Sequence, residues 1–209
     1  MAPGFTVWLT GRPRAGKTTL GRLLTAELMA RGLMVEHLDG DQLRHDLSPD
    51  LGFSPAERHA HCLRAAYLAG LLNRHGVACV VGLVSPLAMS RREARRALGE
   101  FVEVHLDCPL EQAINRDRDG LYERALAGAI KDFTGLDAPY EEPVDPELRL
   151  PTHRQTPAQS LASVLDYLEA AGLAPPAGQS LAAGPGDAPA YTPEDERQVE
   201  RRLKELGYL

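Results

Sequence analysis

The chain lacks most of the features that would place it in a membrane, on nucleic acid or around a metal ion bound by cysteines. No apolar run among its 209 residues approaches the roughly 20 residues that a membrane helix needs. No basic run exceeds two residues and the net charge is −6, which argues against a nucleic-acid surface. The three cysteines, Cys62, Cys79 and Cys108, lack metal-ligand spacing and suit reduced thiols in a cytoplasmic core. We expect no signal peptide, because Met1-Ala-Pro-Gly leads directly into an apolar run.

The length and the distribution of Ala, Pro and Gly predict one domain with an appendage. A chain of this length buries one core and is short for two. We therefore expect a catalytic domain over residues 1–173, followed by an Ala/Pro/Gly-rich linker over residues 174–192. Residues 193–209 have the pattern of an amphipathic helix. The apolar stripe of this helix must pack against another surface. That surface could belong to its own domain, to a second subunit or to another protein.

Residues 11–18 read Gly-Arg-Pro-Arg-Ala-Gly-Lys-Thr, which is a complete G-x-x-x-x-G-K-T phosphate loop. It lies between a strand-like run, Phe5 to Leu9, and a segment with apolar residues at helical spacing, Lys17 to Arg31. Glycines allow such a loop to turn its backbone N–H groups towards phosphate oxygens at a helix N-terminus. Lys17 would supply charge and Thr18 a ligand for Mg²⁺, so ATP and Mg²⁺ are the expected cofactors.

Alternating strand and helix patterns predict an α/β fold of the P-loop NTPase type. We expect three layers, in which helices flank a mostly parallel five-stranded sheet, with the linker and helix appended at the C-terminus. Residues 117–145 are rich in charge, Gly and Pro, and they indicate an active-site lid. The further strand predictions are residues 34–38, 77–84 and 101–106, and the further helix predictions are residues 55–75, 91–98, 109–115 and 157–171.

Several motifs together resemble the adenylylsulfate (APS) kinase family over roughly residues 5–170. Members of this family phosphorylate the 3′-hydroxyl of APS with ATP and give PAPS. The long run that begins at Gly120-Leu121-Tyr122 and continues from Ile130 to Glu141 is the most specific part, because generic nucleotide binding does not call for it. The other matching motifs are Gly16-Lys17-Thr18-Thr19, Leu38-Asp39-Gly40-Asp41 followed by Arg44, Leu51-Gly52-Phe53-Ser54, and Ser85-Pro86.

The resemblance implies roles for residues on the ATP side. Lys17, Asp39 and Asp41 would be catalytic, with Asp41 helping to deprotonate the acceptor hydroxyl. Thr18 and Asp39 would place Mg²⁺, although both carboxylates have an alternative role as turn caps. The residues that would bind ATP are Gly11, Arg14, Ala15, Gly16, Lys17, Thr18, Thr19 and Arg116.

The resemblance also implies an acceptor site. Arg44 and Arg58 would bind the phosphosulfate end, although both would also suit solvated helix positions. Phe53 and Phe133 resemble the two family aromatics that would sandwich the adenine of APS. Two of the four Phe thus lie in polar, Gly-flanked loops, where core packing would not explain them. The residues that would bind the substrate are Asp41, Arg44, Phe53, Arg58, His61, Ser85, Lys131 and Phe133.

The sequence departs from the family pattern more on the acceptor side than on the ATP side. Arg14 replaces a Gly of the phosphate loop, and Asp119 replaces the Lys expected before Gly-Leu-Tyr. Gln42 and His61 each stand where the family has Asn, and Ala88 replaces an Arg. APS is nevertheless the expected acceptor. One alternative is a kinase of the same fold that acts on another small nucleotide or nucleotide conjugate. The other is a catalytically impaired nucleotide-binding protein in which Arg14 obstructs the loop or holds it closed.

The expected protein is thus a cytoplasmic, magnesium-dependent transferase of sulfate assimilation that acts on a small nucleotide. We expect no nucleic-acid partner and no membrane contact. The resemblance is compatible with a homodimer. The residues do not establish the oligomeric state or whether PAPS serves reduction or sulfation.

Overall fold

The computed structural model describes residues 4–178. Its centre is a five-stranded sheet in the order β2-β3-β1-β4-β5, and every neighbouring pair of strands in it is parallel. Parallel pairing carries all five carboxyl ends to one edge, where open α/β sheets bind ligands. The strands are β1 (Thr6–Thr10), β2 (Val35–Asp39), β3 (Ala78–Gly82), β4 (Phe101–Asp107) and β5 (Leu148–Pro151).

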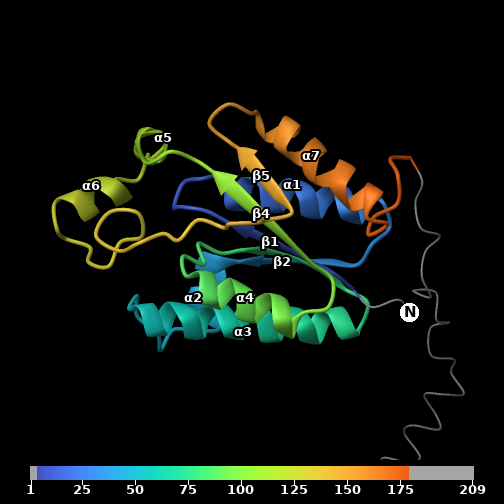
Figure 1. Ribbon diagram of the computed structural model, residues 1–209, viewed down its shortest axis with the longest axis horizontal. Helices are drawn as coiled ribbons and strands as arrows, with labels where there is room; N and C mark the ends of the chain where they lie inside the picture. The colour runs from blue at the N-terminus through green and yellow to red at the C-terminus, as the bar shows by residue number, and fades with distance from the viewer. Residues whose placement is uncertain (1–3, 179–209) are drawn as a thin grey trace, which may run out of the picture.

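Helices cover both faces of the sheet, which confirms the predicted three layers. Helices α1 and α7 lie together on one face, and α2, α3 and α4 lie on the other (Figure 1). Two short helices, α5 and α6, extend beyond the carboxyl end of β4 (Figure 1). The helices are α1 (Lys17–Ala30), α2 (Gly40–Asp46), α3 (Pro55–Arg74), α4 (Ala88–Ala97), α5 (Leu110–Asn115), α6 (Leu121–Leu126) and α7 (Pro157–Ala170).

The central strand β1 divides the core into two halves, because its side chains alternate between the faces of the sheet. Val7 and Leu9 belong to the apolar cluster under α1 and α7. Trp8 belongs to the cluster under α3 and α4, where its ring lies 5.7 Å from that of Phe101. All five residues of β1 are buried, so the phosphate loop that follows Thr10 starts from a rigid base.

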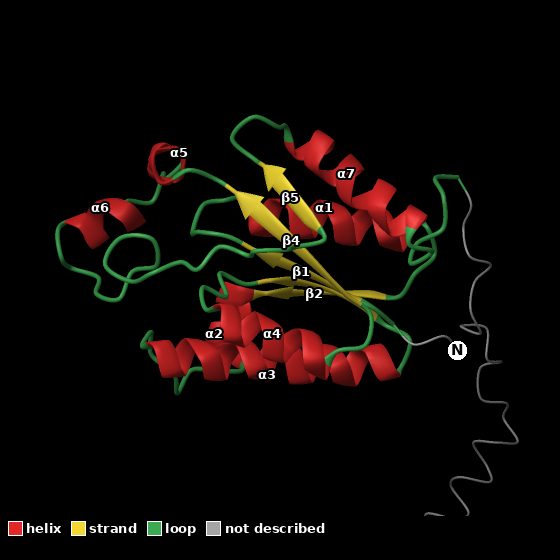
Figure 2. Cartoon of the chain, in the orientation of Figure 1, coloured by secondary structure: helices red, strands yellow, loops and turns green. Residues whose placement is uncertain are grey.

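The predicted lid joins α6 to β5 by a long segment with little regular structure. Figure 2 shows it in green, returning from α6 across the carboxyl ends of the strands. Helix α6 lies inside the region expected to be a loop, and α2 begins directly at Gly40, where the sequence suggested only the end of a strand. Both helices have at most seven residues, which is too short for a clear apolar period.

The domain extends slightly beyond its predicted end. Ala174 is buried, and the backbone carbonyl of Pro175 accepts a hydrogen bond from Arg31 at 2.8 Å. The rest of the predicted linker beyond residue 178, and the predicted helix over residues 193–209, lie outside the described residues. None of the helices described between residues 4 and 178 is both long and apolar enough to cross a bilayer.

Candidate active site

The phosphate loop joins β1 to α1 and has the backbone shape that its glycines predict. Gly16, directly before α1, has φ +107°, a conformation that side chains with a Cβ rarely adopt. A Cβ on Gly11 would lie 2.8 Å from the carbonyl oxygen of Leu106, so only glycine lets the loop pass β4 this closely. Ala15, within the loop, is fully buried, and Thr19 on α1 is exposed.

Lys17 lies within the loop. Its Nζ donates to the carbonyl oxygens of Gly11 at 3.0 Å and Arg12 at 2.9 Å. Burial lowers the pKa of Lys17 to about 8, although the carboxylates of Asp41 and Asp39 act in the opposite direction. The ammonium group of Lys17 therefore loses its proton at a lower pH than that of an exposed lysine.

The side chains of Thr18 and Asp39 meet beside the loop. Thr18 Oγ1 donates to Asp39 Oδ2 at 2.7 Å, and Asp39 Oδ1 caps α2 by accepting from the N–H of Asp41 at 3.0 Å. A hydroxyl and a carboxylate at the mouth of a phosphate loop form an oxygen donor set that fits Mg²⁺, which usually takes few protein ligands beside phosphates and water. Residues 4–178 hold no cluster of three or more His, Cys, Asp or Glu able to bind a metal without such help.

Arg14 reaches away from the loop and towards the lid. Its backbone has φ +63°, in the left-handed region that favours the glycine found there in the resembled family. Its Nε donates to Asp117 Oδ1 at 3.0 Å, and its Nη2 donates to Asp119 Oδ2 at 2.7 Å. Two departures that the sequence presents as separate, Arg14 and Asp119, therefore form an ion pair.

On the acceptor side, two arginines enclose one aromatic ring. The guanidinium carbons of Arg44 and Arg58 lie 5.0 and 5.3 Å from the centre of the Phe53 ring. Arg44 also donates to the carbonyl of Gly52 at 2.9 Å, and Arg58 donates to that of Phe53 at 2.8 Å. Phe53 remains 53% exposed, so its ring has surface left on which a base can stack.

Phe133 lies in a different environment from the one expected. It is buried and packs edge-on against Tyr122, with ring centres 4.9 Å apart. The expectation that core packing would not explain Phe133 is therefore wrong, because the lid folds this ring into the apolar cluster under α1. Lys131, two residues earlier, is exposed.

His61 and Ser85 are also buried, and their polar atoms have partners within the protein. His61 Nδ1 lies 3.0 Å from Ser48 Oγ, and burial together with nearby arginines lowers the pKa of His61 to about 4. Ser85 Oγ accepts from Trp8 Nε1 at 3.1 Å and donates to Thr10 Oγ1 at 2.9 Å. In this arrangement both side chains support the site structurally, through hydrogen bonds within the protein.

Arg116 lies at the far side of the phosphate loop. It donates to the carbonyl oxygen and to the hydroxyl of Thr152, and its Nη1 lies 3.6 Å from Cys108 Sγ. Thr152 Oγ1 in turn donates to the carbonyl of Ala15 at 3.0 Å. Thr152 thus connects Arg116 to Ala15 of the phosphate loop, on the ATP side of the site.

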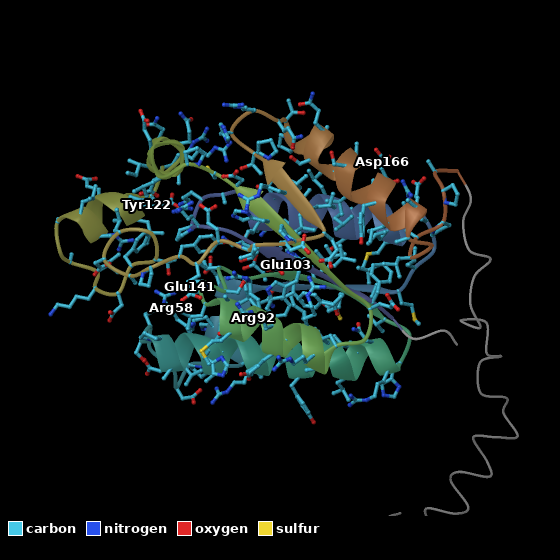
Figure 3. The ribbon with its side chains drawn as sticks, in the orientation of Figure 1. Arg58, Arg92, Glu103, Tyr122, Glu141 and Asp166 are labelled. Carbon is cyan, nitrogen blue, oxygen red and sulfur yellow. The ribbon has the colours of Figure 1, made fainter. Side chains whose placement is uncertain are left out.

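Two further residues, Tyr122 and Arg91, belong to the site by their contacts. Tyr122 donates from its hydroxyl to the carbonyl of Pro13 at 3.0 Å, which brings α6 against the phosphate loop. Figure 3 shows Tyr122 at α6 and Arg58 on α3, both at the end of the molecule where the strands end. Arg91, which is 3% exposed, donates to the carbonyls of Ser85 and Glu141 and so ties the lid to the end of β3. Only Tyr122 had a sequence signal, because it ends the Gly-Leu-Tyr motif.

Comparison with known proteins agrees with this geometry. The family model described as adenylylsulphate kinase matches residues 3–151. An adenylyl-sulfate kinase of Deinococcus deserti is 47% identical over 165 residues, which cover 79% of this chain and 91% of the relative. A protein named probable bifunctional SAT/APS kinase 2, from Sorangium cellulosum, is 45% identical over 86% of this chain, and the match spans 31% of that relative's length.

A solved structure extends the likeness to three dimensions. The APS kinase of Mycobacterium tuberculosis in complex with AMPPNP and APS superposes with a TM-score of 0.77 at 40% identity, covering 81% of this chain and 99% of that one. The family model covers more than half of the chain, and the superposition covers 81% of it. The chain therefore belongs to the adenylylsulphate kinase family.

Proposed function

We propose that the chain transfers the γ-phosphoryl group of ATP to the 3′-hydroxyl of adenosine 5′-phosphosulfate, giving PAPS and ADP. The main support for this proposal is the position of helix α2. Its first turn places Asp41 close enough to Lys17 to act on the pKa of the lysine, and Arg44, one turn later, contacts the Phe53 loop. A seven-residue helix thus joins the two substrate sites, as a direct transfer between bound substrates requires.

The residues have distinct tasks in this reaction. A bond forms between the 3′-oxygen and the γ-phosphorus, the bond from that phosphorus to the ADP oxygen breaks, and Asp41 accepts the hydroxyl proton. Lys17 binds the phosphate oxygens as their charge redistributes. Mg²⁺, held through Thr18 and Asp39, would neutralise phosphate charge when it is bound.

The acceptor is held by the groups around Phe53. Arg44 and Arg58 match the tetrahedral oxyanions of the phosphosulfate, and the exposed face of Phe53 takes the adenine. Arg116 lies by the adenine of ATP. The ion pair with Arg14 neutralises the charge of Asp119, so this departure from the family pattern does not leave an unpaired carboxylate near an anionic substrate.

ADP release from ATP and Mg²⁺, measured with APS and with a panel of other adenine and cytosine nucleotides, tests the proposal. We expect APS-dependent turnover at low substrate concentration. Lys17→Ala should remove about 3 kcal/mol or more of transition-state stabilisation and so lower this turnover. The control is Arg22→Ala, at an exposed position of the same helix, which should leave turnover unchanged. Turnover only with another nucleotide would show that APS is not the acceptor. Tight ATP binding without any turnover would favour a catalytically impaired nucleotide-binding protein.

We also propose a cytoplasmic protein without nucleic-acid or membrane contacts, for which the family resemblance is compatible with a homodimer. The acidic net charge and the absence of long basic runs support the first exclusion. Light scattering on the purified full chain measures the oligomeric state directly, and a monomer at micromolar concentration would contradict the dimer.

A further inference from the structure

Arg14 connects the phosphate loop to the start of α6 through a buried carboxylate. The Asp117 side chain is only 3% exposed, and Arg14 Nε lies 3.0 Å from its Oδ1. A carboxylate that is removed from water needs a charged or hydrogen-bonding partner, and leaving it unpaired is costly. Asp119 is 72% exposed and pairs with the outer edge of the same guanidinium. Arg14 is therefore the cation that allows two acidic side chains to lie beside a phosphate site.

Asp117 passes this contact on to Tyr122. Its second oxygen accepts from the N–H of Tyr122 at 2.6 Å, in the first turn of α6. The hydroxyl of the same tyrosine returns to the phosphate loop at Pro13. Tyr122, which is fully buried, thus links the phosphate loop to the start of α6 through its backbone N–H at one end and its hydroxyl at the other.

Tyr122 in turn contacts the acceptor side of the lid. Its ring meets Phe133 edge-on, and the N–H of Phe133 donates to Asp137 at 2.6 Å. The neighbouring carbonyl, of Asp132, accepts from Arg58, which is one of the two arginines at Phe53. An unbroken series of contacts therefore runs from Arg14 to the acceptor arginines.

We propose that Arg14 is a positioning residue that couples nucleotide binding at the phosphate loop to the order of the acceptor-side loop, residues 130–137. When the phosphate loop binds the phosphates of ATP, Pro13 and Arg14 are fixed in place, and they hold Tyr122 and Asp117, on which the packing of Phe133 depends. Arg14 also shields the phosphates from the two carboxylates, which would otherwise repel them. The acceptor part of this inference rests on the proposed function, and the nucleotide part does not.

Arg14→Gly is a suitable variant because glycine adopts φ +63° without strain, so the loop backbone is retained. Arg118→Gln is the matched control, since Arg118 is an exposed cation in the same segment. Thermal melting of both variants verifies that they fold.

Hydrogen exchange with a non-hydrolysable ATP analogue tests the nucleotide part without any acceptor. We expect the analogue to slow exchange in residues 118–137 by at least about threefold in the natural chain and in Arg118→Gln. In Arg14→Gly, protection should remain at residues 11–18 and disappear from residues 118–137. Equal protection of residues 118–137 in all three proteins would overturn the proposal.

Binding of APS with and without the analogue tests the acceptor part. The ratio of the two dissociation constants should be at least about fivefold in the natural chain and close to one in Arg14→Gly. In the double variant Arg14→Gly/Asp119→Lys, the introduced ammonium can pair with Asp117, and the ratio should recover. An unchanged ratio in Arg14→Gly would overturn the coupling. Failure of APS to bind any of the proteins would instead overturn the proposed acceptor and leave the exchange result standing.

Discussion

Lys17 holds its proton less firmly than an exposed lysine does, because burial lowers its pKa from 10.5 to about 8. Phosphate oxygens favour the charged form, so bound ATP should raise this pKa again. Well below pH 8 the lysine is charged with or without ATP, so this group should add no pH dependence to the affinity for ATP. Above pH 8 the free protein loses the proton that the complex needs, so the affinity should fall by up to about tenfold per pH unit.

Calorimetry in two buffers of different ionisation enthalpy measures this linkage. Near pH 8.5 we expect ATP binding to take up a substantial fraction of one proton, and near pH 7 almost none from this group. Binding at pH 8.5 with no buffer dependence would show that Lys17 keeps its proton in the free protein.

Phe53 and Phe133 should respond differently to truncation. Phe53→Ala should weaken APS binding by roughly 1–3 kcal/mol and leave the melting temperature nearly unchanged, because the ring is half exposed. Phe133→Ala should lower the free energy of unfolding by about 3 kcal/mol, since it removes a buried ring from Tyr122. Urea denaturation and APS titration separate the two effects. A Phe133 variant of natural stability but weakened APS binding would restore the original sandwich interpretation.

Among the helices, α2 depends on close contact with the end of β3. A Cβ on Gly40 would lie 2.8 Å from the backbone oxygen of Gly82, which has no freedom to move aside in a central strand. Gly40→Ala should therefore push the first turn of α2 outwards and displace Asp39 and Asp41 from the phosphate loop. We expect turnover to fall by at least about tenfold.

Gly99→Ala is the control for this prediction, because a Cβ at that position meets nothing within 4 Å. Steady-state kinetics of both variants provide the measurement. Turnover of Gly40→Ala equal to that of Gly99→Ala would mean that α2 tolerates displacement.

For the molecule as a whole, the position at which the chain leaves the domain matters for stability. Arg31 is buried and donates to Glu169 and to the carbonyl of Pro175, and Ala174 packs into the core. Truncation after Gly172 should remove the contacts of Ala174 and Pro175, keep the pair of Arg31 with Glu169, and lower the free energy of unfolding by about 1–3 kcal/mol. Truncation after Gly178 should retain both the melting temperature and the turnover.

Comparing the two truncated proteins by thermal melting and by ADP release tests this boundary. Equal melting temperatures would place the end of the domain before Leu173. Loss of turnover after truncation at Gly178 would assign a function in catalysis to the tail.

Local patterns were sufficient to predict the elements whose determinants lie within a few residues of one another. The phosphate loop depends on its own glycines, and α3 starts where Ser54 and Glu57 form a reciprocal cap, as their spacing predicts. The expected boundaries of α1, α3 and α7 agree with the structure to within about two residues, because each combines a start signal with an apolar period. The boundaries of the six-residue α5 also agree, because Pro109 marks its start. The strand β5 has four residues and only one buried position, and no pattern in the sequence located it.

Contacts between residues far apart in the chain required the folded structure. Arg14 and Asp119 are 105 positions apart, and nothing in either segment indicates that their charges meet. Phe133 resembles an exposed lid residue in sequence, yet the return of the lid over the sheet buries it against Tyr122. The sequence therefore specified the chemistry of the phosphate site and the family, because those reside in short contiguous motifs. Which side chains the lid contacts depended on the tertiary structure, because the parallel sheet brings loops that are distant in the sequence to one edge. Side chains pair when they are close in space, even if they are far apart along the chain.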